Sequence, residues 1–123
     1  MQSLNVILLQ SDSSVAQTLV ASLCSSFHSV RMVRSLDELR TSIPKHRCDV
    51  VVLDMEVATL SDVERLSREF PQACIVCTHR LADEEMWTAA LNAGAVDICP
   101  STDAQSILMA ALRNGSQTRS AAA

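Results

Sequence analysis

The sequence predicts a single α/β domain built on a doubly wound, five-stranded parallel sheet with helices on both faces. Three observations lead to this fold class. Short apolar segments alternate with longer segments of helical periodicity along the chain. The connections between them are short, as in successive β-α units. Residues 50–53 form an unbroken run of three valines and a leucine, which is typical of a central strand covered on both faces.

The first two β-α units come before the unbroken apolar run. Residues 6–9 predict the first strand, and Ser14 begins a capping-box pattern for the first helix. Residues 30–33 predict a short second strand. Ser35 is expected to cap the second helix, which should end before Pro44 because the residue preceding a proline disfavours helical geometry.

The third unit contains the apolar run itself, in a strand expected at 49–53. A helix is expected over 61–70, with Ser61 as its cap and Pro71 as its stop. Residues 74–77 predict the fourth strand. Each strand is thus followed by a helix, as a parallel sheet requires.

The last two helices frame the fifth strand. Good helix formers over 82–93 predict a helix that Gly94 terminates. Residues 95–99 predict the fifth strand, and a final helix is expected to open at Thr102. The polar and small residues from 114 to the end of the sequence are typical of a linker or a frayed end.

Composition limits the class of protein. A chain of 123 residues with 48% hydrophobic content can bury a core of its own, so we expect one domain over 1–113 and a linker or disordered tail over 114–123. The net charge is −4 and the ten Lys and Arg residues are scattered, which argues against binding of nucleic acid or of an anionic membrane. No segment approaches the roughly 20 apolar residues of a membrane span. We expect a soluble cytoplasmic protein.

Five cysteines make an odd set, and three of them lie in strand-like apolar segments. This pattern favours reduced thiols that serve as small core residues over a disulfide framework. Cys74 and Cys77 have the spacing of redox and zinc motifs. Residues three apart on a strand point to opposite faces, however, so a shared metal or a disulfide between them is not expected.

Asp54 directly follows the central apolar run and is the first candidate for a functional site. Ligands and chemistry gather at the carboxyl ends of strands in open α/β sheets. An acid at this position is therefore a candidate site residue before any family is considered. The alternative is that Asp54 only caps the following turn.

Three short motifs in register resemble the receiver domain of two-component response regulators, over about the first 113 residues. Residues 49–54 are similar to the third strand of that family with its phosphoacceptor aspartate, which the resemblance places at Asp54. Residues 74–78 look like the fourth strand, with Thr78 as the switch hydroxyl. Residues 90–97 are similar to the signature before the fifth strand. The resemblance implies a flavodoxin-like fold of the receiver type and a role in phosphorelay signal transduction.

The sequence departs from the receiver pattern at the residues that bind metal and phosphate. Gln10 and Ser11 stand where the family has two adjacent acids that hold magnesium, and Asp12 follows one place late. Ser101 replaces the lysine that grips the phosphoryl group. Ile98 replaces the aromatic residue that is coupled to the switch hydroxyl. The magnesium cage and the cationic clamp are therefore largely lost.

These departures are consistent with one another. With one carboxylate left and no lysine, Asp54 can be satisfied by hydroxyl or amide donors from Gln10, Ser11, Thr78 or Ser101, without metal. We therefore expect an atypical receiver domain that signals through protein contacts with a histidine kinase or an output domain. Conventional phosphorylation should be impaired or absent. We expect no catalytic residue, no enzymatic activity and no cofactor.

Two alternatives stay open. Asp12 and Glu56 could rebuild a weak magnesium site with Asp54, giving an orthodox phospho-accepting receiver, which could be the regulatory part of a longer DNA-binding regulator. A small enzyme of flavodoxin-like fold is the other alternative. The sequence has only two glycines, Gly94 and Gly115, and so lacks the Gly-rich loop that would bind phosphate after the first strand.

The resemblance places the signalling face on the fourth helix, fifth strand and fifth helix. Trp87, the only tryptophan, lies in this region beside Met86. A lone aromatic residue on a helix is more often part of the core than of a contact surface, although an exposed one would mark a binding hot spot. A homodimer through the same face is compatible with the resemblance.

Overall fold

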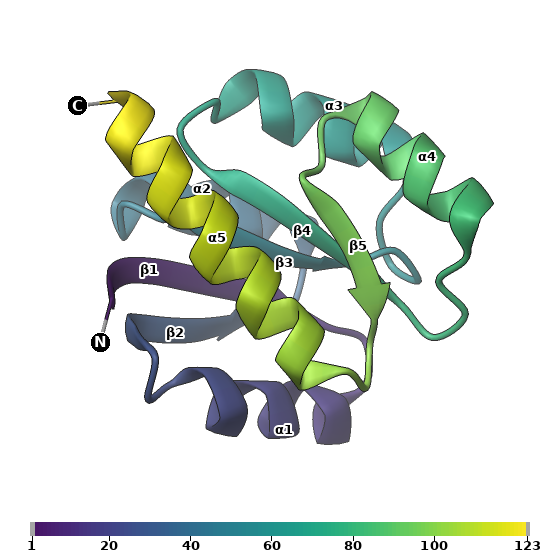
Figure 1. The fold of residues 1–123 in the computed structure, drawn as a ribbon, viewed down its shortest axis with the longest axis horizontal. Helices are drawn as coiled ribbons and strands as arrows, with labels where there is room; N and C mark the ends of the chain where they lie inside the picture. Colours follow the sequence, from purple (N-terminus) through teal and green to yellow (C-terminus); the bar gives the residue numbers. More distant parts are fainter. Residues whose placement is uncertain (1, 123) are drawn as a thin grey trace.

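Five parallel strands form one sheet in the order β2-β1-β3-β4-β5, and helices connect them (Figure 1). The computed structural model describes residues 2–122. The strands are β1 Gln2–Leu9, β2 Phe27–Val33, β3 Val50–Asp54, β4 Cys74–His79 and β5 Asp97–Pro100. The helices are α1 Ser13–Leu23, α2 Leu36–Lys45, α3 Leu60–Glu69, α4 Glu84–Ala93 and α5 Ala104–Ala122. The predicted doubly wound parallel sheet is confirmed.

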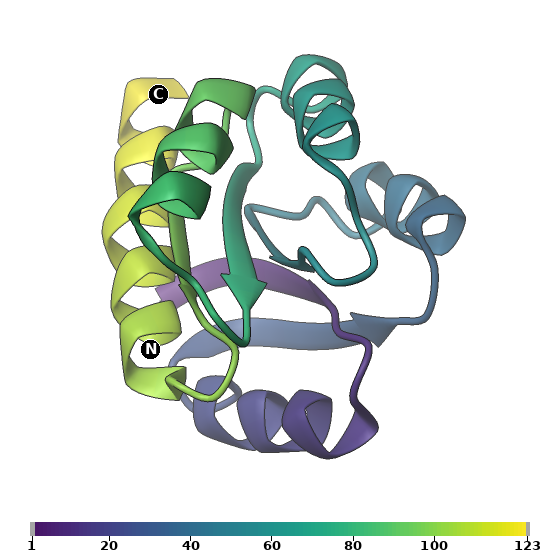
Figure 2. The same ribbon diagram turned by 90° about the vertical axis from the view of Figure 1, so that its right-hand side faces the viewer.

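The helices form two layers, one on each face of the sheet. α1 and α5 pack on one face, and α2, α3 and α4 pack on the other, so that each face has its own hydrophobic cluster. Figure 2 shows α5 and the pair α2 and α3 on opposite sides of the sheet. Within residues 2–122, no helix is both long and apolar enough to cross a bilayer.

The central strands are apolar on both faces because helices cover both. Along β3, Val50 and Val52 face the α1 and α5 side, whereas Val51 and Leu53 face the other helices, and all four are fully buried. The period-two alternation of a strand sends neighbouring side chains into different layers. This arrangement explains why the run contains no polar residue before Asp54.

Two helix ends use the expected residues. The Ser35 hydroxyl caps α2 by accepting a hydrogen bond from the Glu38 backbone N–H at 3.1 Å. Gly94 ends α4 with a φ of 114°, a left-handed conformation that glycine adopts without steric cost.

The expected end of α2 was wrong, since this helix includes Pro44 and continues to Lys45. Pro44 lacks the N–H for one helical hydrogen bond, and the helix ends one residue later.

Three helices begin at a different cap from the one expected. The Asp12 carboxylate, for example, accepts from the backbone N–H groups of Ser14 and Val15 at 2.8 and 3.3 Å. Several Ser, Thr and Asp residues precede each apolar stripe, and helical periodicity fixes a start only to within one or two residues. The expected caps were Ser14, Ser61 and Thr102, whereas the observed caps are Asp12, Thr59 and Asp103.

The last helix is longer than the sequence indicated. It was expected to end by residue 113, with a linker or disordered tail over 114–123, but α5 continues to Ala122. Gly115 lies inside it and allows a close approach to the sheet. A Cβ atom at this position would lie 2.9 Å from both Leu4 Cδ1 and Val50 Cγ2. Residue 123 lies outside the described part, and a linker role for this end of the sequence stays a prediction.

Four of the five cysteine side chains are buried in the core. Cys74 packs in the cluster under α1 and α5, whereas Cys77 packs in the opposite cluster, so the two sulfurs lie on different faces of the sheet as predicted. Burial raises the pKa of the Cys48, Cys74, Cys77 and Cys99 thiols to about 12. These thiols stay protonated at neutral pH and are therefore poor nucleophiles and poor metal ligands.

Replacing Gly115 by alanine tests the close approach of α5. Overpacking costs about 1–3 kcal/mol, while alanine gains about 1 kcal/mol of helix propensity over glycine. We therefore expect Gly115→Ala to lower the free energy of unfolding by about 1 kcal/mol in urea denaturation. Arg113→Ala, at an exposed position of the same helix, should stay within about 0.5 kcal/mol of the wild type. A more stable Gly115→Ala variant would show that this segment does not pack on the sheet.

Thiol accessibility gives a second test of the fold. Cys24 is exposed and the other four cysteines are buried. Because alkylation requires an accessible thiolate, iodoacetamide at pH 8 should modify the native protein once, at Cys24, and the urea-unfolded protein at every cysteine. Intact mass spectrometry counts the adducts. Rapid native modification of Cys74 or Cys77 would contradict the structure.

Candidate functional site

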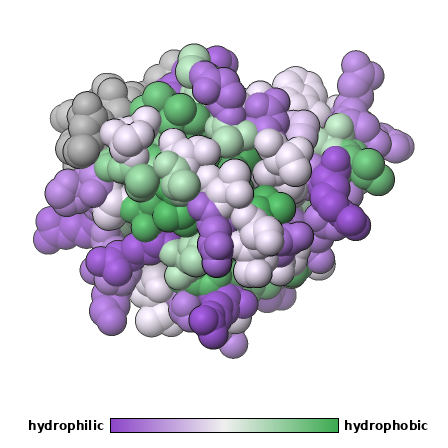
Figure 3. All heavy atoms as spheres, turned by 90° about the horizontal axis from the view of Figure 1, so that it is seen from below, coloured by the Kyte–Doolittle hydropathy of each residue, from purple (hydrophilic) through white to green (hydrophobic). Residues whose placement is uncertain are grey.

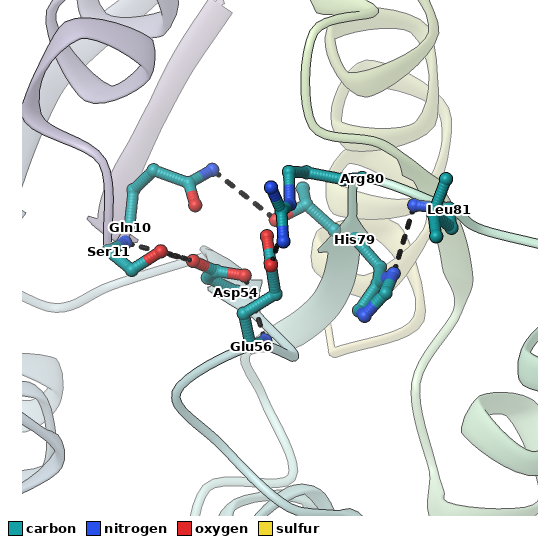
Figure 4. Close-up of polar contacts among 8 residues, drawn as sticks. Gln10, Ser11, Asp54, Glu56, His79, Arg80 and Leu81 are labelled. Carbon is teal, nitrogen blue, oxygen red and sulfur yellow. Dashed lines mark hydrogen bonds and ion pairs between the residues drawn. The ribbon is translucent and has the colours of Figure 1, made fainter.

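The candidate site lies where β1, β3 and β4 end at the same edge of the sheet (Figure 4). Parallel pairing sets Leu9 opposite Leu53 and Asp54 opposite Thr78. The residues that follow Leu9, Gln10 and Ser11, therefore lie beside Asp54. The register of the sheet thus brings together side chains that are more than 40 positions apart in the chain.

Asp54 is fully buried, with an exposed fraction of 0%, and three hydrogen bonds hold its carboxylate. Oδ2 accepts from the Ser11 backbone N–H at 2.9 Å and from the Ser11 hydroxyl at 2.6 Å. Oδ1 accepts from the Glu56 backbone N–H at 2.9 Å. A buried carboxylate is tolerated only with such donors, because its desolvation is otherwise too unfavourable. No cationic side chain contacts Asp54 among the described residues.

The other three donors expected for Asp54 do not bond to it. The Gln10 side-chain amide donates to the Thr78 hydroxyl at 3.4 Å. The Ser101 hydroxyl is buried, at 2% exposure, and has no hydrogen-bond partner among the described residues. Its backbone N–H donates to the His79 carbonyl at 3.1 Å, which ties the end of β5 to β4. Ser11 is therefore the one member of the expected set that donates to Asp54.

Glu56 forms an ion pair that the sequence did not predict. Its Oε1 accepts from Arg80 Nε at 2.8 Å, and Figure 4 shows this pair beside Asp54. Arg80 is mostly exposed, whereas the Glu56 side chain is mostly covered. The pair could have been predicted from position in the sequence, because Arg80 follows the fourth strand, Glu56 follows the third, and both strands end at one edge of the sheet. An exposed pair of this kind contributes at most about 1 kcal/mol.

The acids expected to form a weak magnesium site do not gather around Asp54. Asp12 is exposed and caps α1, while Glu56 pairs with Arg80. Among the described residues, no three His, Cys, Asp or Glu side chains cluster as a metal site would require. Magnesium needs octahedral oxygen ligands at 2.0–2.1 Å, and the three hydrogen bonds that Asp54 accepts leave about one of its roughly four acceptor positions open. In this arrangement Asp12, Asp54 and Glu56 do not form a three-carboxylate magnesium site.

Ile98 and His79 lie on the α4 side of this edge. Ile98 is buried beneath α4 and lines an apolar pocket of about 260 Å³ with His79 and Met86. His79 Nδ1 accepts from the Leu81 backbone N–H at 3.0 Å and so shapes the turn after β4. The expected switch residues Thr78 and Ile98 lie on the adjacent strands β4 and β5, where Thr78 pairs with Cys99 and Ile98 pairs with Cys77.

Trp87 faces solvent, so the more frequent of the two alternatives, a place in the core, does not apply to it. Its exposed fraction is 48%, whereas its neighbour Met86 packs against the core. Consecutive helical positions point about 100° apart, so only one of the two can face the sheet. Periodicity alone did not reveal which one, because both residues are large and apolar.

Removing the Ser11 hydroxyl should destabilise the protein. A hydrogen bond to a charged group contributes about 1.5–3 kcal/mol, so Ser11→Ala should lower the free energy of unfolding by about that amount in urea denaturation. Ser14→Ala is the matched control, because Ser14 is exposed and contacts Asp54 neither through its side chain nor through its backbone. Equal stability of the two variants would show that the Ser11 hydroxyl does not support Asp54.

Comparison by sequence finds no relative: no protein-family model matches, and neither does any curated protein. Comparison by structure, in contrast, finds similar proteins. NtrX from Brucella abortus superposes with a TM-score of 0.85 at 15% identity over 96% of this chain. The response regulator RcsB from Salmonella typhimurium gives 0.79 at 20% identity over 94%. A CheY-like receiver domain protein from Methanospirillum hungatei gives 0.82 at 13% identity over 97%.

The three proteins differ in how much of their length is matched. The chain spans 27% of the NtrX chain and 62% of the RcsB chain, but 98% of the Methanospirillum hungatei protein. The likeness therefore covers nearly all of a receiver domain protein in one case and part of a longer chain in the others. By its architecture, this chain has the fold of the receiver domains of response regulators.

Proposed function

We propose that the protein is an atypical receiver-type signalling module that acts by binding other proteins and not as an enzyme, and that conventional phosphorylation of Asp54 is impaired. The observation that carries the proposal is the state of Asp54. It is fully buried, and its carboxylate is held by Ser11 and by the Glu56 backbone, with no contact to a cationic side chain among the described residues.

The two demands of phosphoryl transfer support the proposal. The attacking oxygen must be accessible in line with the phosphorus, and cations must stabilise the charge on the transferred group. Asp54 is inaccessible, and both of its oxygens already accept hydrogen bonds. Arg80 is the nearest cation drawn in Figure 4, and its partner is Glu56. Ser101, where the resemblance expects a lysine, brings no charge.

Likeness of fold to response regulators supports a place in two-component signalling. The proposed partners are a histidine kinase or an output domain, either on another protein or further along the same polypeptide. A cytoplasmic location belongs to the same proposal. Because NtrX and RcsB are longer than the matched region, a regulator with additional domains is compatible with it.

An orthodox phospho-accepting receiver is the second candidate, and one observation favours it. Asp54 and Thr78 are register partners at the ends of β3 and β4, as the resemblance requires. Magnesium binding would then need Asp12 to leave the α1 cap and Glu56 to leave Arg80. Both carboxylates would have to move, because neither contacts Asp54 in this structure.

Phosphorylation by a small donor separates the two candidates. The wild type, incubated with magnesium and acetyl phosphate, should gain no phosphoryl group in intact mass spectra. A variant with the pocket rebuilt, Gln10→Asp/Ser11→Asp/Ser101→Lys, restores two acids and a cation and should become modified. Asp54→Asn in each background is the control for the site of modification.

Stoichiometric modification of the wild type that Asp54→Asn abolishes would overturn the proposal. If the rebuilt variant is folded by circular dichroism but also unmodified, the loss of phosphorylation cannot be attributed to the three replaced positions, and that part of the explanation would fall.

A further inference from the structure

We propose that a groove between the carboxyl-terminal ends of α2 and α3 binds a small aromatic carboxylate, and that Arg47 is the residue that binds its anionic group. The groove, called the Arg47 groove below, has a volume of about 520 Å³, which is the size of a small-molecule site. It lies at the amino ends of β3 and β4, whereas Asp54 ends β3 at its carboxyl end. The inference therefore concerns a second site and does not depend on the proposed function.

The walls of the Arg47 groove are apolar. Ile43 and Pro44 line it from α2, and Phe70 lines it from the end of α3. Phe70 is half-buried and packs against the core, so its ring is held in place and can contact a flat ligand. Apolar walls alone would be weak evidence, because hydrophobic side chains also reach the surface between hydrophilic ones on the face that Figure 3 shows. The arginine at the rim is more informative.

Arg47 has a backbone conformation that favours glycine. α2 ends in a Schellman-type turn, in which the Cys48 N–H donates to the Ile43 carbonyl at 3.0 Å and the Arg47 N–H donates to the Pro44 carbonyl at 3.4 Å. Arg47 has a φ of 51° and is the one non-glycine residue with a positive φ in the described chain. Glycine adopts this conformation without strain, whereas an L-residue does not. The stability of the turn therefore does not explain the arginine, and strained residues cluster at functional sites.

The turn is held without the help of the Arg47 side chain. The side-chain amide of Asn5 donates to the carbonyls of His46 and Arg47 at 3.2 and 3.3 Å, so β1 fixes the backbone at this point. The Arg47 side chain itself is exposed, and it makes no hydrogen bond or ion pair with any residue from 2 to 122 that the structure describes. Its guanidinium group is therefore available to a ligand.

The other charged side chains at the rim already have partners. Arg40 donates from Nε and Nη2 to the two carboxylate oxygens of Glu69, at 3.1 and 3.3 Å, and this pair crosses from α2 to α3. Oδ2 of Asp49 accepts from the Asn5 backbone N–H at 2.8 Å. Arg47 can therefore bind a carboxylate through two parallel N–H bonds. Because the Arg40–Glu69 pair crosses the groove, a compact ligand fits better than an extended peptide.

The helix dipoles oppose an anion at this place, but only weakly. Both helices direct their carboxyl-terminal ends toward the groove, and each end carries about half a negative charge. That partial charge is spread over carbonyl groups, of which those of Ile43 and Pro44 already accept backbone hydrogen bonds. Arg47 offers a full positive charge in direct contact with the ligand, and the exposed Lys45 adds a second one nearby. A full charge in contact outweighs the partial charges.

Titration of the full chain with naphthoate, followed by residue-resolved amide NMR, tests the proposal. Acetate supplies the anion without the ring, and naphthamide supplies the ring without the charge. Naphthoate should shift the amide signals of residues 43–49 and 70–73 and leave those of 54–56 unchanged. A dissociation constant of about 1 mM is expected for a ligand of this size. Acetate and naphthamide should each bind at least about tenfold more weakly.

Variants of Arg47 separate binding from a structural role. Arg47→Gly should weaken naphthoate binding about tenfold and should keep or raise the Tm, because glycine adopts a φ of 51° without strain. Arg47→Asn removes the same charge with a residue that also tolerates the left-handed region, and it should weaken binding similarly. Arg65→Gln is the matched control, since Arg65 is exposed on α3 and does not line the groove, and it should stay within about twofold.

Several results would overturn the proposal. No binding of naphthoate, equal binding of naphthamide or acetate, or amide shifts confined to other residues would each do so. A lower Tm of Arg47→Gly, or an unchanged affinity in both Arg47 variants, would show that the arginine is structural. A glutamate-rich peptide that shifts the same signals with higher affinity than naphthoate would assign the groove to a protein partner instead. Phosphorylation of wild-type Asp54 would overturn only the proposed function, because the two sites lie at opposite ends of β3.

Discussion

The hydrogen bonds between Ser11 and Asp54 are the constraint on which the rest of the candidate site depends. A carboxylate with no exposure to solvent must be satisfied by fixed donors or the fold loses stability. Ser11 supplies two of them, one from its backbone and one from its hydroxyl. These two donors are available only because β1 and β3 pair in parallel and in register, so that both strands end at the same edge of the sheet.

This solution differs in kind from a site that holds its charge with a cation. A metal ion or a lysine would neutralise the charge of the carboxylate, whereas N–H and O–H donors only hydrogen-bond to it. The backbone and the side chain of Glu56 have different partners. Its backbone supports Asp54 while its side chain pairs with Arg80, so the loop after β3 is tied to the loop after β4. The Ser101 hydroxyl is buried in the same pocket but has no hydrogen-bond partner in the part of the chain that the structure describes.

β5 connects the pocket to the α4 side of the molecule. Pro100 pairs in register with His79, and the Ser101 backbone N–H donates to the His79 carbonyl. Ile98, on the same strand, is buried in the hydrophobic cluster to which α4 contributes.

The sequence by itself determined the fold class, the order of the elements, the buried central run before Asp54 and the termination of α4 at Gly94, because periodicity and glycine geometry are local properties of the chain. Tertiary structure decided the rest. Whether Trp87 or Met86 faces the core, how far α5 continues past Gly115, and that Glu56 pairs with Arg80 all depend on how distant segments pack. Such contacts arise from register and close approach in three dimensions, which the local periodicity of the chain does not encode.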